Sequence, residues 1–214
     1  MTDDLIKTPL DQASRIMNVE AAWNSMADSR RPPDGQVRPE ILQSWSRCLA
    51  HNTDMLQAKA WLETESEEKM GLNSYLLSVG PVHMQKLHEL LKGQGFIIML
   101  LAPDGFILSI KGDRRMCGLG EAVNLVPGGN NSEQHLGTTA SSISLIQGIA
   151  TQVLRHEHYC QFYHDWCCSA SPIYDRQGRL LGALNLANRE ISRHPPQLLD
   201  LVKMVHPVNA YLAS

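Results

Sequence analysis

The N-terminal part of the chain carries apolar side chains at intervals of three and four residues, the spacing of one helix face. This pattern predicts an amphipathic helix over residues 11–30, and the sequence Arg31-Pro-Pro-Asp-Gly35 then breaks it. A second apolar stripe follows Pro39, a residue suited to the first turn of a helix. The two stripes are Ile16, Val19, Trp23 and Met26, and then Ile41, Trp45, Cys48 and Leu49.

Helical signals continue to about residue 92. Thr64 followed by Glu67 resembles a capping box, in which each side chain bonds the backbone at the other position. Pro81 is predicted to open a further helix, and Gly93 to end it. The first part of the chain is therefore expected to be helical.

Strand-like runs follow. Residues 96–102 and 106–110 are apolar runs separated by Pro103-Asp104-Gly105, which predicts a β-hairpin. Residues 166–174 and 179–187 flank a turn sequence and predict a second hairpin. A shorter strand is expected over residues 149–154.

Helices are expected between and after these strands. The glycine-rich stretch 118–129 is interpreted as a flexible lid, and Asn131 or Ser132 is expected to cap a helix that ends near Gln147. Pro195 and Pro196 precede a closing amphipathic helix. Its apolar residues are Leu198, Leu201, Val202 and Val205.

This order of elements predicts an α+β fold in which helices flank an antiparallel sheet of about five strands. We expect a helical N-terminal segment over residues 1–70 and a sheet-containing domain over residues 71–214. With 214 residues and 43% hydrophobic residues, the chain can bury one sizeable core.

Charge and cysteine content narrow the function classes. The net charge of −3 does not suggest direct nucleic-acid binding by this chain. No apolar run is long enough for a membrane span and the start lacks a secretory signal, so we expect a cytoplasmic protein without a membrane partner. The 5 cysteines are odd in number, which favours reduced thiols over a disulfide framework.

Four short motifs, in this order, resemble one family. They are Arg38-Pro-Glu-Ile-Leu-Gln-Ser-Trp-Ser-Arg47, Gly95-Phe96, Ser132-Glu133 with Gly137-Thr138, and Cys168-Ser-Ala-Ser-Pro-Ile173 followed by Asp175-x-x-Gly-Arg-Leu-Leu-Gly182. The chain resembles, over about residues 38–212, the N-terminal sensor region of sigma-54-dependent activators of the acetoin and glycerol (dihydroxyacetone) catabolism regulator type. The resemblance implies a GAF-like sensor domain that controls an AAA+ ATPase and a helix-turn-helix domain.

Two departures and one missing motif qualify this resemblance. Gly137-Thr-Thr-Ala140 and Asn185-Leu-Ala-Asn188 differ from the sequences common in relatives, so the ligands of those relatives are not carried over. No phosphate-binding loop of the Gly-x-x-x-x-Gly-Lys-Ser/Thr type occurs, so the ATPase output is not expected in this chain. We expect a sensor module and not an enzyme.

Imidazoles and thiols gather between His156 and Cys168, and zinc and iron prefer such ligands. The spacing lacks a paired Cys-x-x-Cys, and Cys167 and Cys168 point to opposite faces if they lie in a strand. A metal or redox sensor built on this cluster is the first alternative to a ligand sensor, and a small GAF-type reductase is the second. The leading hypothesis needs no metal and no cofactor.

A sensor pocket combines apolar walls with a few polar groups. The resemblance implies a pocket between one sheet face and the connections over residues 123–142 and 156–165. We expect a small organic metabolite to bind there, and a symmetric homodimer to form through the first and closing helices. The residues expected to contact the ligand are His135, Thr138, Ser142, His158, Cys160, Trp166, Cys168 and Asn185.

Overall fold

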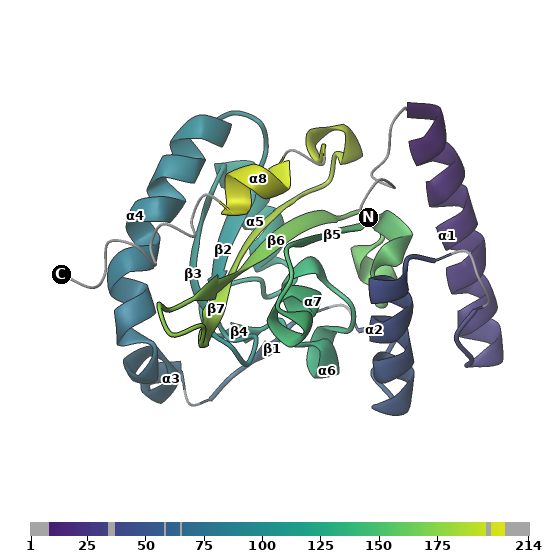
Figure 1. Ribbon diagram of the computed structural model, residues 1–214, viewed down its shortest axis with the longest axis horizontal. Coiled ribbons are helices and arrows are strands. Elements are labelled where there is room, and N and C mark those ends of the chain that lie inside the picture. Colours follow the sequence, from purple (N-terminus) through teal and green to yellow (C-terminus); the bar gives the residue numbers. More distant parts are fainter. Residues whose placement is uncertain (1–8, 34–36, 58, 65, 196–197, 204–214) are drawn as a thin grey trace.

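The computed structural model describes residues 9–33, 37–57, 59–64, 66–195 and 198–203. A five-stranded sheet in the order β3-β2-β7-β6-β5 forms its centre, and every neighbouring pair is antiparallel (Figure 1). Both predicted hairpins are present, as β2–β3 and β6–β7. The strands are β2 (Ile97–Leu101), β3 (Ile107–Gly112), β5 (Thr151–Leu154), β6 (Cys167–Tyr174) and β7 (Leu180–Asn188).

Helices lie on both sides of this sheet, so the predicted α+β arrangement is confirmed (Figure 1). A separate two-stranded ribbon joins β1 (Trp61–Leu62) to β4 (Gly129–Asn130). The α-helices are α1 (Pro9–Ser29), α2 (Pro39–Ala50), α3 (Ser66–Leu72), α4 (Ser74–Leu91), α5 (Arg114–Glu121), α6 (Glu133–Leu136), α7 (Ala140–Gln147) and α8 (Leu198–Lys203). The short 3₁₀ helices are η1 (Arg155–Glu157), η2 (Gln161–Tyr163) and η3 (Ile191–Arg193).

One face of the sheet is covered by α4 and α8. Side chains on a strand alternate between faces, so one set of alternate residues packs against these two helices. Val205, predicted for the closing helix, lies outside the described residues, as does the side chain of Leu201. The buried set includes Leu76, Met84 and Leu87 of α4, Ile98, Leu100, Leu184 and Leu186 of the sheet, and Leu198 and Val202 of α8.

The other face is covered by α7 and the η1–η2 connection, with α1 and α2 outside them (Figure 1). Trp23 of α1 donates its indole N–H to the Tyr159 carbonyl at 2.9 Å, and Trp45 of α2 donates to the Glu157 carbonyl at 3.0 Å. The N-terminal helices therefore share a buried cluster with the sheet. That cluster includes Val19, Trp23, Met26, Ile41, Trp45, Ile97, Met99, Ala140, Ile143, Tyr159 and Trp166.

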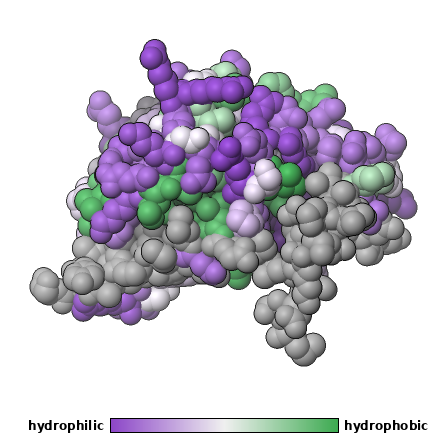
Figure 2. Space-filling view, turned by 90° about the horizontal axis from the view of Figure 1, so that it is seen from above, coloured by the Kyte–Doolittle hydropathy of each residue, from purple (hydrophilic) through white to green (hydrophobic). Residues whose placement is uncertain are grey.

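This burial removes the α1 part of the argument from which the homodimer was predicted. The apolar stripe of α1, at Val19, Trp23 and Met26, is covered within its own chain and is not surplus apolar surface. The side chain of Ile16 lies outside the described residues. In the view of Figure 2, hydrophilic residues predominate and hydrophobic ones form small, separate patches. Dimerisation stays a prediction without that support.

The start of α4 was predicted wrongly, because Pro81 lies inside the helix and not at its first turn. Leu76, Gly80, Met84 and Leu87 of α4 are buried, so packing on the sheet stabilises the helix before Pro81. This packing offsets the hydrogen bond that Pro81 cannot donate and the crowding of its ring against the preceding turn. Gly80 permits this close packing, since a Cβ there would lie 2.4 Å from Leu100 Cδ2.

The single helix predicted up to Gln147 is two helices, α6 and α7, separated at Gly137. Gly137 has a φ of 70°, and a Cβ there would lie 2.8 Å from Tyr159 Cβ, so only glycine fits without strain. Thr139 then caps α7, accepting a bond from the Ser142 N–H at 3.0 Å. Gly148 ends α7 in the left-handed conformation, as its place in the sequence suggested.

The stretch 118–129, interpreted from the sequence as a flexible lid, begins and ends in regular elements. Gly118 and Gly120 lie in α5, and Gly129 lies in β4. Gly120 packs on the sheet, where a Cβ would lie 2.8 Å from Ile97 Cδ1. Glycine is used here for close packing of a helix on a strand. Among the described helices, none has the length and apolar character needed to cross a membrane.

Candidate functional site

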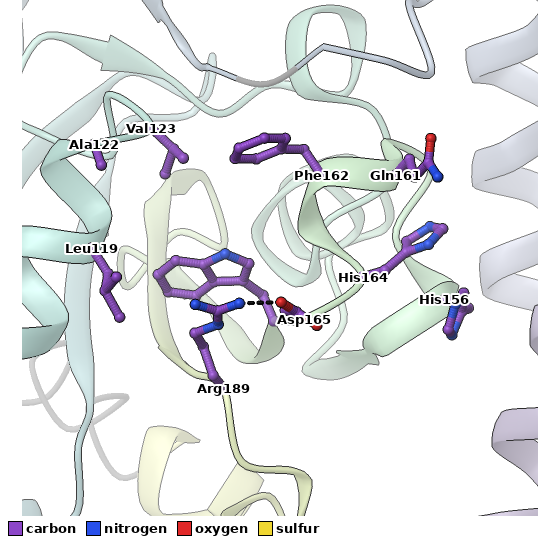
Figure 3. A pocket seen from close by; sticks show the side chains of 10 residues that line it. Leu119, Ala122, Val123, His156, Gln161, Phe162, His164, Asp165 and Arg189 are labelled. Atoms are coloured by element: carbon purple, nitrogen blue, oxygen red, sulfur yellow. Dashed lines mark hydrogen bonds and ion pairs between the residues drawn. The ribbon is translucent and has the colours of Figure 1, made fainter.

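A cleft of about 590 Å³ lies between the C-terminal end of α5 and the η1–η2 connection (Figure 3). Val123, from the first of the two predicted covering connections, lines it together with His156, Gln161, Phe162, His164 and Asp165 from the second. The ends of two central strands close its base, since Trp166 precedes β6 and Arg189 follows β7. Its lining residues are Leu119, Ala122, Val123, His156, Gln161, Phe162, His164, Asp165, Trp166 and Arg189.

The wall of this cleft is apolar on two sides. Leu119 lies in the last turn of α5, Ala122 and Val123 follow that helix, and Phe162 lies across from Val123 (Figure 3). Phe162 is exposed, whereas Trp166 is buried in the core below it. An exposed aromatic ring facing an apolar wall gives a surface on which the hydrocarbon part of a ligand can pack.

Charged groups occupy the base of the cleft. Arg189 donates from Nη2 to Asp165 Oδ2, as Figure 3 shows, and Arg155 Nη1 lies 3.6 Å from Asp165 Oδ1. Arg155 also donates to the Arg189 carbonyl at 3.0 Å. Asp165 therefore has two arginine partners, and they connect the segment before β6 to the segment after β7.

Two histidines lie at the side of the cleft next to α1. The His156 and His164 rings are 4.3 Å apart, and Trp23 packs edge-on against His164 at 4.5 Å. Burial lowers the pKa of His164 to about 3, and burial likewise lowers the pKa of His156. Both imidazoles are therefore neutral at physiological pH.

An ion pair holds the η1–η2 connection in place. Arg38, just before α2, donates from Nε and Nη2 to the two carboxylate oxygens of Glu157 at 3.0 and 2.8 Å. Glu157 also accepts a bond from the Leu154 N–H at 2.9 Å. Arg38 belongs to the motif from Arg38 to Arg47, whose sequence pointed to a family resemblance and not to this contact. Its arginine before an amphipathic helix was the available signal for this anchor.

A second cleft, of about 470 Å³, lies between α6, α7 and β4. His135 and Ser142, both predicted contacts, line it together with Glu133 and Arg47, which form an ion pair at 2.6 Å. His135 Nδ1 is 2.8 Å from Ser132 Oγ. Ser142 Oγ bonds the carbonyls of Gly137 and Thr139 at 3.1 and 3.0 Å, so this hydroxyl already serves the start of α7.

The remaining predicted residues are buried, and they line neither of these two clefts. Thr138 Oγ1 is 2.7 Å from Ser44 Oγ, in the contact between α2 and α6. Cys160 donates to the Asp54 carbonyl at 3.2 Å. His158 Nδ1 is 2.9 Å from the Arg155 carbonyl, and burial lowers the pKa of His158 to about 4. The structure thus distributes the predicted contacts over several places.

Asn185 and Cys168 lie on neighbouring strands of the sheet, on the face below the connections. Asn185 pairs with Met99 of β2 and with Ala170 of β6. Its side chain is buried, and among the described residues its amide has no stronger partner than the Cys168 thiol. Such a group is costly in a protein interior, which marks Asn185 as unusual.

The cysteines of this region are poor nucleophiles in the folded chain. Burial raises the pKa of Cys48 to about 12 and of Cys167 to about 11, and it also raises the pKa of Cys160 and Cys168. A thiol reacts, or binds a metal, as the thiolate. Within the described ranges, no group of three or more His, Cys, Asp or Glu side chains is placed to hold a metal ion.

No protein-family model matches the chain. An uncharacterized 47.3 kDa protein in the thcA 5' region of Rhodococcus erythropolis is 30% identical over 202 residues, 90% of this chain and 46% of that protein. The acetoin dehydrogenase operon transcriptional activator AcoR of Bacillus subtilis is 27% identical over 202 residues, 93% of this chain and 33% of AcoR. Regulators of glycerol and dihydroxyacetone operons match as well.

The chain is homologous to these operon regulators. The resemblance inferred from its motifs is thereby confirmed. The chain spans less than half the length of these curated relatives, since it covers 46% of the Rhodococcus protein and 33% of AcoR.

A solved structure supports the same assignment at the level of the fold. The Escherichia coli DhaR(N)–DhaL complex contains a chain with a TM-score of 0.69 and 22% sequence identity to this protein. The match covers 81% of this chain and 60% of that one. The predicted GAF-like fold is confirmed by this likeness and by the sheet order.

Proposed function

We propose that this chain is the signal-input domain of a transcriptional regulator and that it binds a small organic metabolite without transforming it. The observation that carries the proposal is the cleft of about 590 Å³ between α5 and the η1–η2 connection. Its apolar walls and few polar groups suit a small ligand. Homology to operon regulators supports the regulatory setting.

Trp166 is the predicted contact that lines this cleft, and we place the ligand against it and Phe162. The route from the cleft to the closing helix is short along the chain, because Arg189 is followed by η3 and then by α8. His194 anchors this segment through Ser169 Oγ at 2.8 Å and Asn188 Oδ1 at 3.1 Å. A ligand that repositions Arg189 therefore biases the position of α8, the output element of the proposal.

The proposal includes the setting implied by homology. The domain acts in a regulator with an AAA+ ATPase and a helix-turn-helix domain, and it works as a homodimer without catalysing a reaction. A ligand alters the output only through its different affinity for two arrangements of the domain, typically a coupling of about 1–3 kcal/mol. No reactive thiolate or metal is needed for such coupling.

The test is a thermal-shift screen of this chain with acetoin, glycerol, dihydroxyacetone and small organic acids, amines and alcohols. A ligand at about 100 times its Kd stabilises the folded state by about 2.7 kcal/mol. For a chain of this length that corresponds to a rise in Tm of about 5–10 °C. Titration calorimetry then gives the affinity of any ligand found.

Filling the cleft tests where that ligand binds. Ala122 is exposed at the rim of the cleft, so Ala122→Trp blocks it at little cost in stability. The matched control is Ala21→Trp, on the exposed side of α1 and away from the cleft. We expect the first variant to abolish the ligand-induced shift and the second to keep it. A shift that persists in Ala122→Trp would place the ligand elsewhere and refute this site.

A further inference from the structure

We propose that this cleft is selective for a small carboxylate that carries an apolar group, with Arg189 as the residue that binds the carboxylate. The inference rests on the proposed ligand-sensing function and adds the chemical class of the ligand. It depends on the charges in the cleft, on the number of partners of each charge and on their exposure.

Arg189 is the one cationic side chain among the described residues that line the cleft. His156 and His164 also line it, but their lowered pKa values leave both rings neutral near pH 7. Asp165 is the one carboxylate of the lining. An ionic ligand must therefore exchange with one member of the Arg189–Asp165 pair.

The number of partners decides which member exchanges. Asp165 has two arginine partners, Arg189 and Arg155, whereas Asp165 is the one acidic partner of Arg189 within the described part of the chain. If a ligand carboxylate binds Arg189, Asp165 still pairs with Arg155, so the two arginines are balanced by two carboxylates. If a ligand ammonium takes Asp165, both arginines and the ammonium share one carboxylate. Charge balance favours the carboxylate.

The exposure of the pair makes this exchange inexpensive. The Arg189 side chain is 43% exposed and that of Asp165 is 63% exposed, so water already screens their attraction. A guanidinium can bind a ligand carboxylate through two parallel hydrogen bonds, which adds orientation to the attraction.

The apolar wall fixes the other half of the ligand. Val123 and Phe162 lie across the cleft from the ion pair, and Leu119 lies level with Arg189 (Figure 3). A carboxylate on Arg189 thus directs an attached alkyl or aryl group toward these side chains, where burial of apolar surface contributes affinity. An aryl-acetate combines a carboxylate and an apolar ring in one small molecule.

The test compares three probes that share one aromatic group: phenylacetate, 2-phenylethanol and 2-phenylethylamine. We expect phenylacetate to bind at least about tenfold more tightly than the other two by titration calorimetry. Arg189→Gln removes this preference, whereas Arg114→Gln, an exposed arginine outside the cleft, keeps it. Asp165→Asn strengthens phenylacetate binding, because it removes the internal competitor for Arg189.

The outcomes separate this inference from the proposed function. Preference for 2-phenylethylamine, with loss of binding in Asp165→Asn, overturns the carboxylate class but leaves ligand sensing in place. The carboxylate class is also overturned, with ligand sensing left in place, if 2-phenylethanol binds as tightly as phenylacetate. The same conclusion follows if a neutral metabolite raises Tm and Ala122→Trp blocks that rise. Phenylacetate binding that survives both Arg189→Gln and Ala122→Trp overturns the site as well. If no probe and no screened metabolite binds, both proposals fail.

Discussion

Replacing Arg38 by methionine tests the anchor of the connection that forms one wall of the cleft. Arg38 joins the start of α2 to Glu157 through two charge-assisted bonds and donates to the Gln152 carbonyl at 2.5 Å. The Glu157 side chain is only 2% exposed, whereas Arg38 is 25% exposed. Methionine keeps most of the hydrocarbon packing but removes the charge. It also removes the bond to Gln152 and an ion pair with Glu40 at 2.7 Å, so the Glu157 contribution is isolated only by comparison with Glu157 variants.

The expected loss follows from the burial of Glu157. Removing one partner of a buried pair typically costs about 3–5 kcal/mol, because the other charge stays buried without compensation. Arg38 is partly exposed, and Glu157 keeps its bond from the Leu154 N–H, so we expect the lower end, about 3 kcal/mol. For a chain of this length, that lowers Tm by about 6–12 °C.

The assay is urea-induced unfolding followed by tryptophan fluorescence, with Arg38→Met, Glu157→Gln and the double variant. The neutral amide of Glu157→Gln has less need of a cation, so the double variant should be more stable than the sum of the single losses predicts. Arg193→Met removes an exposed ion pair with Glu190 and serves as the control, with an expected loss below about 1 kcal/mol.

Two results would refute this reasoning. If Arg38→Met lies within about 1 kcal/mol of the unmodified chain, the pair contributes no more than an exposed one. If the losses of the single variants add in the double variant, Arg38 and Glu157 do not interact energetically. In either case a different contact must hold the η1–η2 connection.

Three further predictions concern other parts of the chain. Burial lowers the pKa of His194 to about 3, so between pH 6.5 and 3 the unfolded state binds a proton that the folded state does not, and stability should fall as the pH falls through this range. In His194→Gln, the free energy of unfolding should depend less steeply on pH, by up to about 1.4 kcal/mol per pH unit. Gly137→Ala should destabilise the chain by more than about 1 kcal/mol because of its positive φ and the Tyr159 contact, whereas Gly71→Ala in α3, with open space around it, should stabilise by about 0.5–1 kcal/mol in chemical unfolding. Cys117 is the cysteine that is not buried, so one thiol at most should react quickly with a disulfide reagent in the native state, and Cys117→Ser should abolish that reaction.

The interior strands could be predicted from the sequence because their signals are local. Residues 97–101 are apolar without interruption, as expected for a strand buried on both faces, and the Pro103-Asp104-Gly105 turn fixes the hairpin after them. The first two helices follow equally from the spacing of their apolar residues. Homology explains the GAF-like arrangement, which periodicity alone does not specify.

The interrupted helices could not be predicted in the same way. A helical pattern runs across Gly137, and the sequence does not show that Tyr159 packs against this glycine. Pro81 was interpreted as a helix start because local preference favours it there, but packing of Leu76 and Gly80 on the sheet extends α4 in the N-terminal direction. In both cases a contact distant in sequence outweighs a local preference.

The sequence by itself thus determined the five strands of the central sheet, most helices, the regulator homology and one residue of the larger cleft, Trp166, but not the β1–β4 ribbon. Only the tertiary structure decided that Arg189 and Asp165 pair at the base of that cleft, and that Arg38 anchors its wall through Glu157. The physical reason is range. Periodicity and turn chemistry are properties of neighbouring residues, whereas a binding site is formed by segments that come together only when the sheet is assembled.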